Sequence, residues 1–106
     1  MTAERESPAI RPARAEDCPS ILSLLGQLTD AMEAPVAALP ERVASNIQRF
    51  MQAPDHAVFV AERRGDVLGL ISINIRHTLL NPGPVALIDE LVVADSARGM
   101  GVGRRL

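Results

Sequence analysis

The spacing of hydrophobic residues predicts two helices in the first half of the chain. The first follows Asp17, Pro19 and Ser20, which are typical helix-start residues. Its apolar residues recur at i, i+3, i+4 and i+7 and therefore share one face: Ile21, Leu22, Leu24, Leu25 and Leu28. Gly26 lies within this helix and costs about 1 kcal/mol relative to alanine. Either the helix is weaker there or another element packs closely against it.

The second predicted helix begins at Pro40, because proline suits the first turn of a helix, and it ends at Pro54. One of its faces is apolar and carries Val43, Ile47, Phe50 and Met51. Residues 29–39, between the two helices, have no helical spacing and include Pro35. We expect a loop there.

Four stretches have the composition of β-strands and cover residues 10–13, 57–62, 67–75 and 85–93. The first contains Pro12, which has no N–H to donate to a central ladder. Residues 64–66 (Arg-Gly-Asp) predict a tight hairpin turn, and residues 81–84 (Asn-Pro-Gly-Pro) predict another turn. The elements therefore follow the order β, α, α, β, β, β, and a further helix begins near residue 101.

The composition is that of one folded domain. Hydrophobic residues make up 47% of the 106 residues, and a chain of this length can bury roughly two-thirds of its unfolded surface. We expect the polar residues 1–8 to form a disordered lead-in and residues 9–106 to form the domain. No stretch approaches the ~20 apolar residues of a membrane span, so no membrane partner is expected. With no export signal and a single cysteine, Cys18, we expect a structural thiol and a cytoplasmic location.

The charge and the aromatic content argue against several kinds of partner. The net charge is −2 and the only aromatic rings of the Phe, Tyr and Trp type are Phe50 and Phe59, so nucleic acid is not expected as a partner. His56 and His77 have no acid or cysteine at ligand spacing, so no metal site is expected. Three arginines follow the last acid and would attract an anion: Arg98, Arg104 and Arg105.

A glycine-rich segment, Arg98-Gly99-Met100-Gly101-Val102-Gly103, follows the last predicted strand. Glycines permit positive φ and a close approach of the backbone to a ligand, and the first N–H groups of a helix have no internal partner. These properties predict a phosphate-binding turn. A dinucleotide-binding fingerprint is excluded because Arg104 stands where a glycine is needed, and a nucleotide P-loop is excluded because the sequence has no lysine.

The pattern Arg-x-x-Gly-x-Gly after a strand ending in Leu-Val-Val resembles motif A of the GNAT family of N-acetyltransferases, and the resemblance extends from Ile10 to Leu106. It implies an α/β fold with a mixed, mostly antiparallel sheet and flanking helices. It also implies acetyl-coenzyme A (acetyl-CoA) as cosubstrate. The implied pyrophosphate-binding residues are Arg98, Gly99, Met100, Gly101, Val102, Gly103 and Arg104.

The same resemblance gives a role to the backbone of Leu91, Val92 and Val93. In the family the outer edge of this strand pairs with the pantetheine arm and polarises the thioester carbonyl. Residues two apart on a strand point their N–H groups to the same side, so Leu91 and Val93 would present N–H groups to one ligand. The side chains of these residues also suit an ordinary buried strand.

Two adjacent acids, Asp89 and Glu90, interrupt this apolar strand, and we expect them on opposite faces. A protonated amine must lose a proton before it attacks a thioester, and a carboxylate can accept that proton directly or through water. The resemblance implies direct transfer of the acetyl group to a primary amine of a small molecule or peptide. Glu90 is the favoured base and Asp89 the second; a structural salt bridge or hydrogen bond is the alternative for both.

The resemblance also implies further strands, and a tyrosine that often serves as general acid in the family, whereas this sequence contains no tyrosine. We therefore expect a domain truncated after its fourth strand. The alternative function is a non-catalytic module that binds coenzyme A or forms oligomers. An unpaired fourth strand invites association, which predicts a homodimer.

Overall fold

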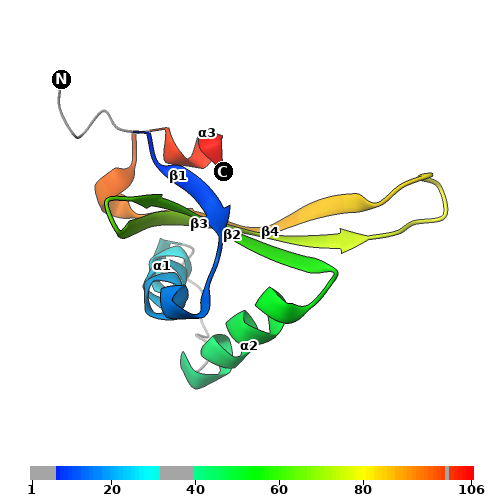
Figure 1. Ribbon diagram of the computed structural model, residues 1–106, viewed down its shortest axis with the longest axis horizontal. Helices are drawn as coiled ribbons and strands as arrows, with labels where there is room; N and C mark the ends of the chain where they lie inside the picture. The colour runs from blue at the N-terminus through cyan, green and yellow to red at the C-terminus, as the bar shows by residue number, and fades with distance from the viewer. Residues whose placement is uncertain (1–6, 32–39, 100) are drawn as a thin grey trace.

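The computed structural model describes residues 7–31, 40–99 and 101–106 (Figure 1). The strands are β1 (Ala9–Pro12), β2 (His56–Arg63), β3 (Asp66–Arg76) and β4 (Val85–Val93). The helices are α1 (Cys18–Ala31), α2 (Pro40–Gln52) and the short α3 (Val102–Arg105). A 3-10 turn precedes α1 at Ala15–Asp17 and another follows β4 at Asp95–Ala97. The predicted order of elements is confirmed.

The four strands form one antiparallel sheet in the order β1-β2-β3-β4. Each strand pairs with the next one along the chain, as expected for strands joined by hairpins. Strand β4 is the last in this order, and no strand of the described residues pairs with its outer edge. The mostly antiparallel sheet predicted from the sequence is confirmed.

Helices α1 and α2 lie on one side of the sheet and α3 lies on the other (Figure 1). The core beneath α1 and α2 contains Ile21, Leu24, Ile47, Val60, Leu70 and Val92. Val60 is opposite Leu70, and Leu70 is opposite Val92, so three neighbouring strands present one apolar row to the helices. The apolar faces predicted for both helices are confirmed by this packing.

Gly69 on β3 allows α3 to pack closely on the other side of the sheet. A Cβ atom at this position would lie 2.9 Å from the carbonyl oxygen of Val92 and 3.1 Å from Cγ1 of Val102. Both distances are too short for an added methyl group, so only glycine fits here without movement. Val102 itself is 1% exposed and holds α3 against the sheet.

Helix α1 is longer than the sequence predicted. Residues 29–31, expected in a loop, form its last turn, and the Thr29 hydroxyl donates to the Gly26 carbonyl oxygen at 2.9 Å. No atom of the residues that the structure describes lies within 4 Å of a Cβ placed at Gly26, so none of these residues packs closely there. Residues 32–39 of the expected loop and residues 1–6 of the expected lead-in lie outside the described residues. Pro8, at the end of that expected lead-in, is buried.

Two hairpins connect the last three strands. Arg64 and Gly65, with φ values of 54° and 83°, form the predicted tight turn between β2 and β3. Two consecutive residues with positive φ match the twist of the flanking strands. The β3–β4 hairpin projects well beyond the other strands (Figure 1), and Leu79 and Leu80 in its connection are fully exposed.

An ion-pair network centred on Arg11 of β1 fixes the start of α1. Its Nη1 and Nη2 donate to the two carboxylate oxygens of Asp17 at 2.7 and 2.9 Å, and its Nε donates to Glu62 Oε1 at 2.6 Å. Asp17 also accepts the backbone N–H of Arg14 at 2.7 Å. Although Asp17 is only 5% exposed, hydrogen bonding to Arg11 holds the pKa of its carboxyl group below the usual value.

Within the described ranges, no helix combines the length and the apolar character that crossing a membrane requires.

Candidate active site

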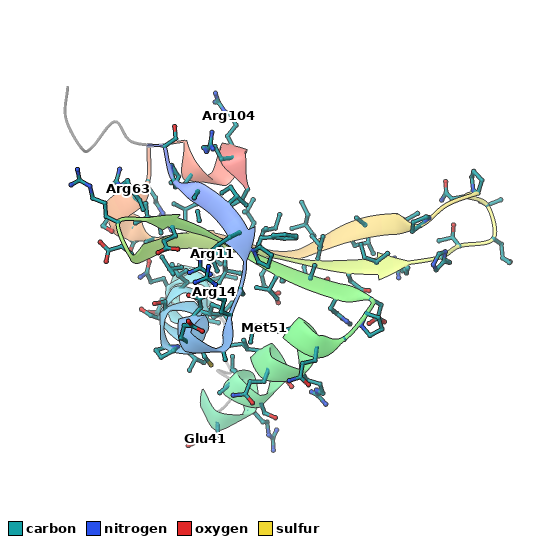
Figure 2. All side chains as sticks on the ribbon, in the orientation of Figure 1. Arg11, Arg14, Glu41, Met51, Arg63 and Arg104 are labelled. Atoms are coloured by element: carbon teal, nitrogen blue, oxygen red, sulfur yellow. The ribbon has the colours of Figure 1, made fainter. Side chains whose placement is uncertain are left out.

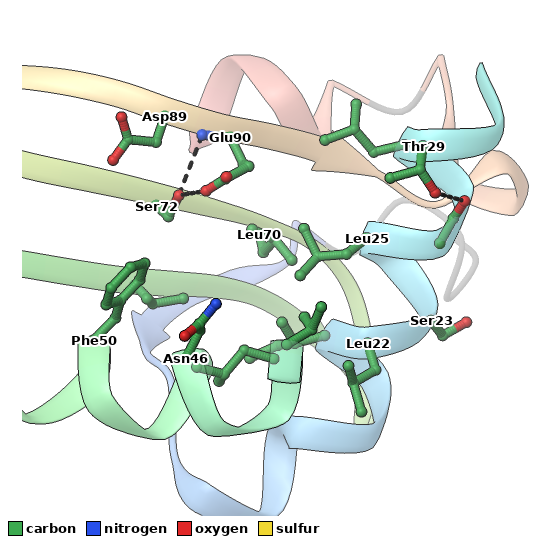
Figure 3. A pocket seen from close by; sticks show the side chains of 16 residues that line it. Leu22, Ser23, Leu25, Thr29, Asn46, Phe50, Leu70, Ser72, Asp89 and Glu90 are labelled. Carbon is green, nitrogen blue, oxygen red and sulfur yellow. Dashed lines mark hydrogen bonds between the residues drawn. The ribbon is translucent and has the colours of Figure 1, made fainter. Parts of the chain in front are cut away.

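A cavity of about 710 Å³ lies between α1, α2 and the sheet (Figure 3). Its apolar lining consists of Ile21, Leu22, Leu25, Leu28, Val43, Ile47, Phe50, Val58 and Leu70. Its polar side chains are Ser23, Thr29, Asn46, Ser72, Asp89 and Glu90. The volume lies within the usual range for small-molecule sites. We call it the helix-side cavity.

Glu90 is held at the wall of this cavity by Ser72 on β3. The two residues are direct partners in the strand register. The Ser72 hydroxyl donates to Glu90 Oε1, and the Glu90 backbone N–H donates to Ser72 Oγ at 3.2 Å (Figure 3). Sequence reasoning missed Ser72. Its signal was a lone hydroxyl residue in the apolar run of residues 67–73.

Asp89 lies at an irregularity in the pairing of β3 with β4. Ser72 pairs with Glu90, but Ile73 pairs with Ile88, so Asp89 is an extra residue on β4. Such a bulge interrupts the alternation of side chains, and both acids line the helix-side cavity. The expectation of opposite faces for Asp89 and Glu90 therefore does not hold. Asp89 is exposed, whereas Glu90 is half-buried.

A second cavity of about 640 Å³ lies at the end of β4, beside the glycine-rich turn. It is lined by Val93, Ala97, Arg98, Gly99, Gly101, Val102, Gly103 and Arg104. We call it the turn cavity. Six of the seven residues predicted to hold a pyrophosphate line it, and the seventh, Met100, lies outside the described residues.

Two of the three glycines adopt the backbone conformation that the sequence predicted for the turn. Gly99 has φ 86° and Gly101 has φ 77°, both in the left-handed region that favours glycine. Gly103 lies inside α3 and has no positive φ; a Cβ atom there would contact Cγ2 of Val93 at 3.5 Å. At Gly103 the positive φ that glycine permits is not used, because the helix has already begun there.

The arginines contribute less charge to the turn than their number predicts. Arg98 Nη2 lies 3.1 Å from Asp95 Oδ1, which offsets its charge. Arg104 lies on the exposed side of α3 and extends away from the body of the protein (Figure 2). The Asp95 N–H donates to Gln27 Oε1 at 3.1 Å and thereby ties the connection after β4 to α1. The glycine backbone is thus the better-placed part of the turn for an anion.

The backbone of β4 presents alternate N–H groups to its two edges. The N–H of Glu90 donates to Ser72 Oγ, and that of Ala94 donates to the Leu68 carbonyl oxygen at 2.8 Å, so both face β3. By alternation, the N–H groups of Leu91 and Val93 face the outer edge. Val92 is 4% exposed, as in an ordinary buried strand, but Leu91 is 44% exposed.

The remaining candidate residues, Cys18, His56 and His77, line neither cavity. Cys18 is half-buried and packs against the hydrophobic core. The His56 ring stacks on Phe50 with a centroid distance of 4.4 Å, and His77 is exposed. No group of three metal-ligating side chains occurs among the residues whose positions are described.

The described residues thus form an α/β domain with an antiparallel sheet, a cavity under two helices and a glycine-rich turn after β4. A family model described as "Acetyltransferase (GNAT) family" matches residues 21–106, and the chain belongs to this family. The resemblance identified from the sequence is confirmed. The comparison with curated proteins found no match to the chain.

Solved structures share the fold. A possible acetyltransferase from Clostridium difficile 630 is 17% identical with a TM-score of 0.83, covering 94% of this chain and 66% of the other. An aminoglycoside acetyltransferase from an uncultured soil metagenomic sample, in complex with sisomicin, is 20% identical with a TM-score of 0.72, covering 92% and 63%. Glucosamine-6-phosphate N-acetyltransferase from Arabidopsis thaliana is 25% identical with a TM-score of 0.74, covering 94% and 69%. The chain thus spans about two thirds of the length of these proteins.

Proposed function

We propose that the protein transfers an acetyl group from acetyl-CoA directly to a primary amine of a small molecule or peptide. The observation that carries this proposal is the position of β4 between the two cavities. Glu90 lines the helix-side cavity, and Val93, three residues along the same strand, lines the turn cavity. An amine in the first cavity and a thioester lying along β4 would meet beside Glu90.

The described residues fit the cosubstrate. Gly99 and Gly101 bring the backbone close to the turn cavity without a side chain in the way, and the first N–H groups of α3 have no partner within the helix. The outward N–H groups of Leu91 and Val93 suit the carbonyl groups of a pantetheine arm and a thioester. Bound there, acetyl-CoA supplies an activated acetyl group.

Glu90 is the proposed base. It accepts a proton from the ammonium group, either directly or through a water molecule, and leaves the nitrogen lone pair free to attack the thioester carbonyl carbon. The carbon–sulfur bond then breaks, the leaving sulfur takes up a proton, and the amide nitrogen keeps one hydrogen. Overall one proton is released to solvent. The sequence has no tyrosine, so the acid that protonates the sulfur is not a tyrosine of this chain.

The structural relatives support an amine acceptor, because two of them are named for acetylation of aminoglycosides and of glucosamine 6-phosphate. The test is release of free thiol from acetyl-CoA by the wild-type chain and by Glu90→Gln, with a panel of primary amines. We expect release that requires an amine and falls in Glu90→Gln. Release that is unchanged in Glu90→Gln would contradict the role of Glu90.

A second candidate function is a non-catalytic module that binds coenzyme A. The turn cavity favours it, because its glycine lining suits a pyrophosphate whether or not an acceptor is acetylated. Coenzyme A binding without thiol release for any amine would support this second function and contradict the first.

A further inference from the structure

We infer that the helix-side cavity accepts a primary amine carried on a compact apolar body, such as an alkyl or arylalkyl group. This inference rests on the proposed function, which makes that cavity the acceptor site.

The apolar part of the wall comes from both helices. Leu22 and Leu25 of α1 and Phe50 of α2 line the cavity and are only half-buried, so each has apolar surface left to contact a ligand (Figure 3). Removing such surface from water is favourable in proportion to its area. An apolar body of the acceptor would complete the burial of these side chains.

The charged part of the wall is entirely acidic. Asp89 and Glu90 line the cavity, and no arginine or histidine does so among the described residues. Two carboxylates favour an ammonium group and disfavour a phosphate or carboxylate. A sugar phosphate would therefore meet two like charges and no partner of opposite charge.

The remaining polar groups are mostly engaged within the protein. The Ser72 hydroxyl donates to Glu90, the Thr29 hydroxyl donates to the Gly26 carbonyl oxygen, and Asn46 Oδ1 accepts from Arg49. A ligand rich in hydroxyl groups would thus be buried with few partners, which is unfavourable. The cavity suits one cationic group on an otherwise apolar molecule.

A larger side chain in place of Gly26 would reduce the volume of the helix-side cavity. Gly26 lines the cavity on α1, and a Cβ atom there would meet no atom within 4 Å in the described part of the chain. Leucine is also a better helix former than glycine. Gly26→Leu should therefore occupy part of the cavity without disturbing the helix, and Gly26→Ala is the matched control.

The experiment measures binding to the 106-residue chain through backbone amide chemical shifts, with no acetyl-CoA present. The probes are 2-phenylethylamine, its alcohol analogue 2-phenylethanol, spermidine and glucosamine 6-phosphate. We expect 2-phenylethylamine to shift the amides of Gly26, Ser72 and Glu90 and to bind about tenfold or more tightly than the other three. Gly26→Leu should weaken it about tenfold or more, and Gly26→Ala less than about twofold. Circular dichroism checks that both variants fold.

Equal or tighter binding of spermidine, glucosamine 6-phosphate or 2-phenylethanol would overturn the inference, and so would unchanged binding in a folded Gly26→Leu variant. The outcome is separable from that of the proposed function. If an apolar amine binds but acetyl-CoA releases no thiol in its presence, acetyl transfer is contradicted, whereas the inferred class of ligand still holds. If thiol is released only with polar amines, acetyl transfer is supported and the inferred preference for apolar amines is overturned.

Discussion

Ser72 and Glu90 face each other across β3 and β4 and are joined by two hydrogen bonds. The serine hydroxyl donates to the glutamate carboxylate and accepts the glutamate backbone N–H. Ser72 is 7% exposed, so it is fixed by the sheet around it. One buried hydroxyl group thus sets both the backbone and the side chain of Glu90 at the wall of the helix-side cavity.

The first prediction separates the two acids. Glu90→Gln should lower kcat by about 10²–10⁴, the usual contribution of a general base. Asp89→Asn should change kcat by less than about tenfold, since the exposed bulge residue only adds negative charge near the amine. Steady-state thiol release measures both, with the exposed Glu41→Gln as a surface control. A larger loss in Asp89→Asn than in Glu90→Gln would make Asp89 the base.

The second prediction concerns Ser72. Ser72→Ala should lower kcat about tenfold while leaving the KM for acetyl-CoA unchanged, because Glu90 loses a partner and the turn cavity is untouched. The unpaired Glu90 N–H should also lower the free energy of unfolding by about 1–3 kcal/mol. Ser72→Thr keeps the hydroxyl and should restore most of kcat. Full activity in Ser72→Ala would show that Glu90 needs no positioning by this residue.

The third prediction concerns the ion-pair network at the start of α1. Removing one charge of a buried pair is costly, so Asp17→Asn should lower the free energy of unfolding by about 3 kcal/mol at neutral pH. Because the folded-state pKa of Asp17 is lowered, its stabilising effect is complete above the usual value of 3.8 and is lost as the pH falls below it.

Urea unfolding of wild type and Asp17→Asn at pH 7 and pH 3 measures this effect, with the exposed Asp30→Asn as control. The difference between wild type and Asp17→Asn should shrink at the lower pH. A difference that stays the same or grows on acidification would contradict the network.

The fourth prediction concerns association. Ile88 and Leu91 on β4 are 61% and 44% exposed, and the outer edge of β4 is unpaired within the described residues. We expect the chain to form dimers that Ile88→Lys disrupts, since a lysine beside a strand edge opposes pairing. Light scattering after size exclusion measures the mass. Disruption by Leu79→Lys instead would place the contact at the hairpin tip, and a monomeric wild type would refute the dimer.

Local patterns were enough to predict most elements and the glycine turn. The bounds of β4 agree with the predicted strand at residues 85–93, because an apolar run bounded by turn residues is a local signal. The positive φ at Gly99 and Gly101 was also predictable, since it depends on the residue itself.

The contacts of Glu90 could not be predicted from local sequence patterns. Its pairing with Ser72, 18 residues earlier, and the bulge at Asp89 depend on the register between β3 and β4. Register is set by the packing of the whole sheet rather than by any short segment. The Arg11–Asp17–Glu62 network was missed for the same reason, because it joins residues up to 51 positions apart.

We propose that the backbone of the glycine-rich turn binds coenzyme A, and isothermal titration calorimetry of variants at two salt concentrations tests this binding. Gly101→Val strains a residue with φ 77° at the turn cavity, and Gly65→Val imposes the same strain at φ 83° in the β2–β3 turn, whose residues do not line that cavity. Arg105→Ala removes an exposed charge on α3 and changes no backbone.

We expect the wild type to bind coenzyme A more tightly than ATP or NAD, Gly101→Val to abolish measurable binding, and Gly65→Val to leave it unchanged in folded protein. Arg105→Ala should weaken binding at most about fivefold, and more at low salt than at high salt. Normal binding by Gly101→Val, or a larger loss in Arg105→Ala, would contradict the account and leave side-chain charge as the source of anion binding.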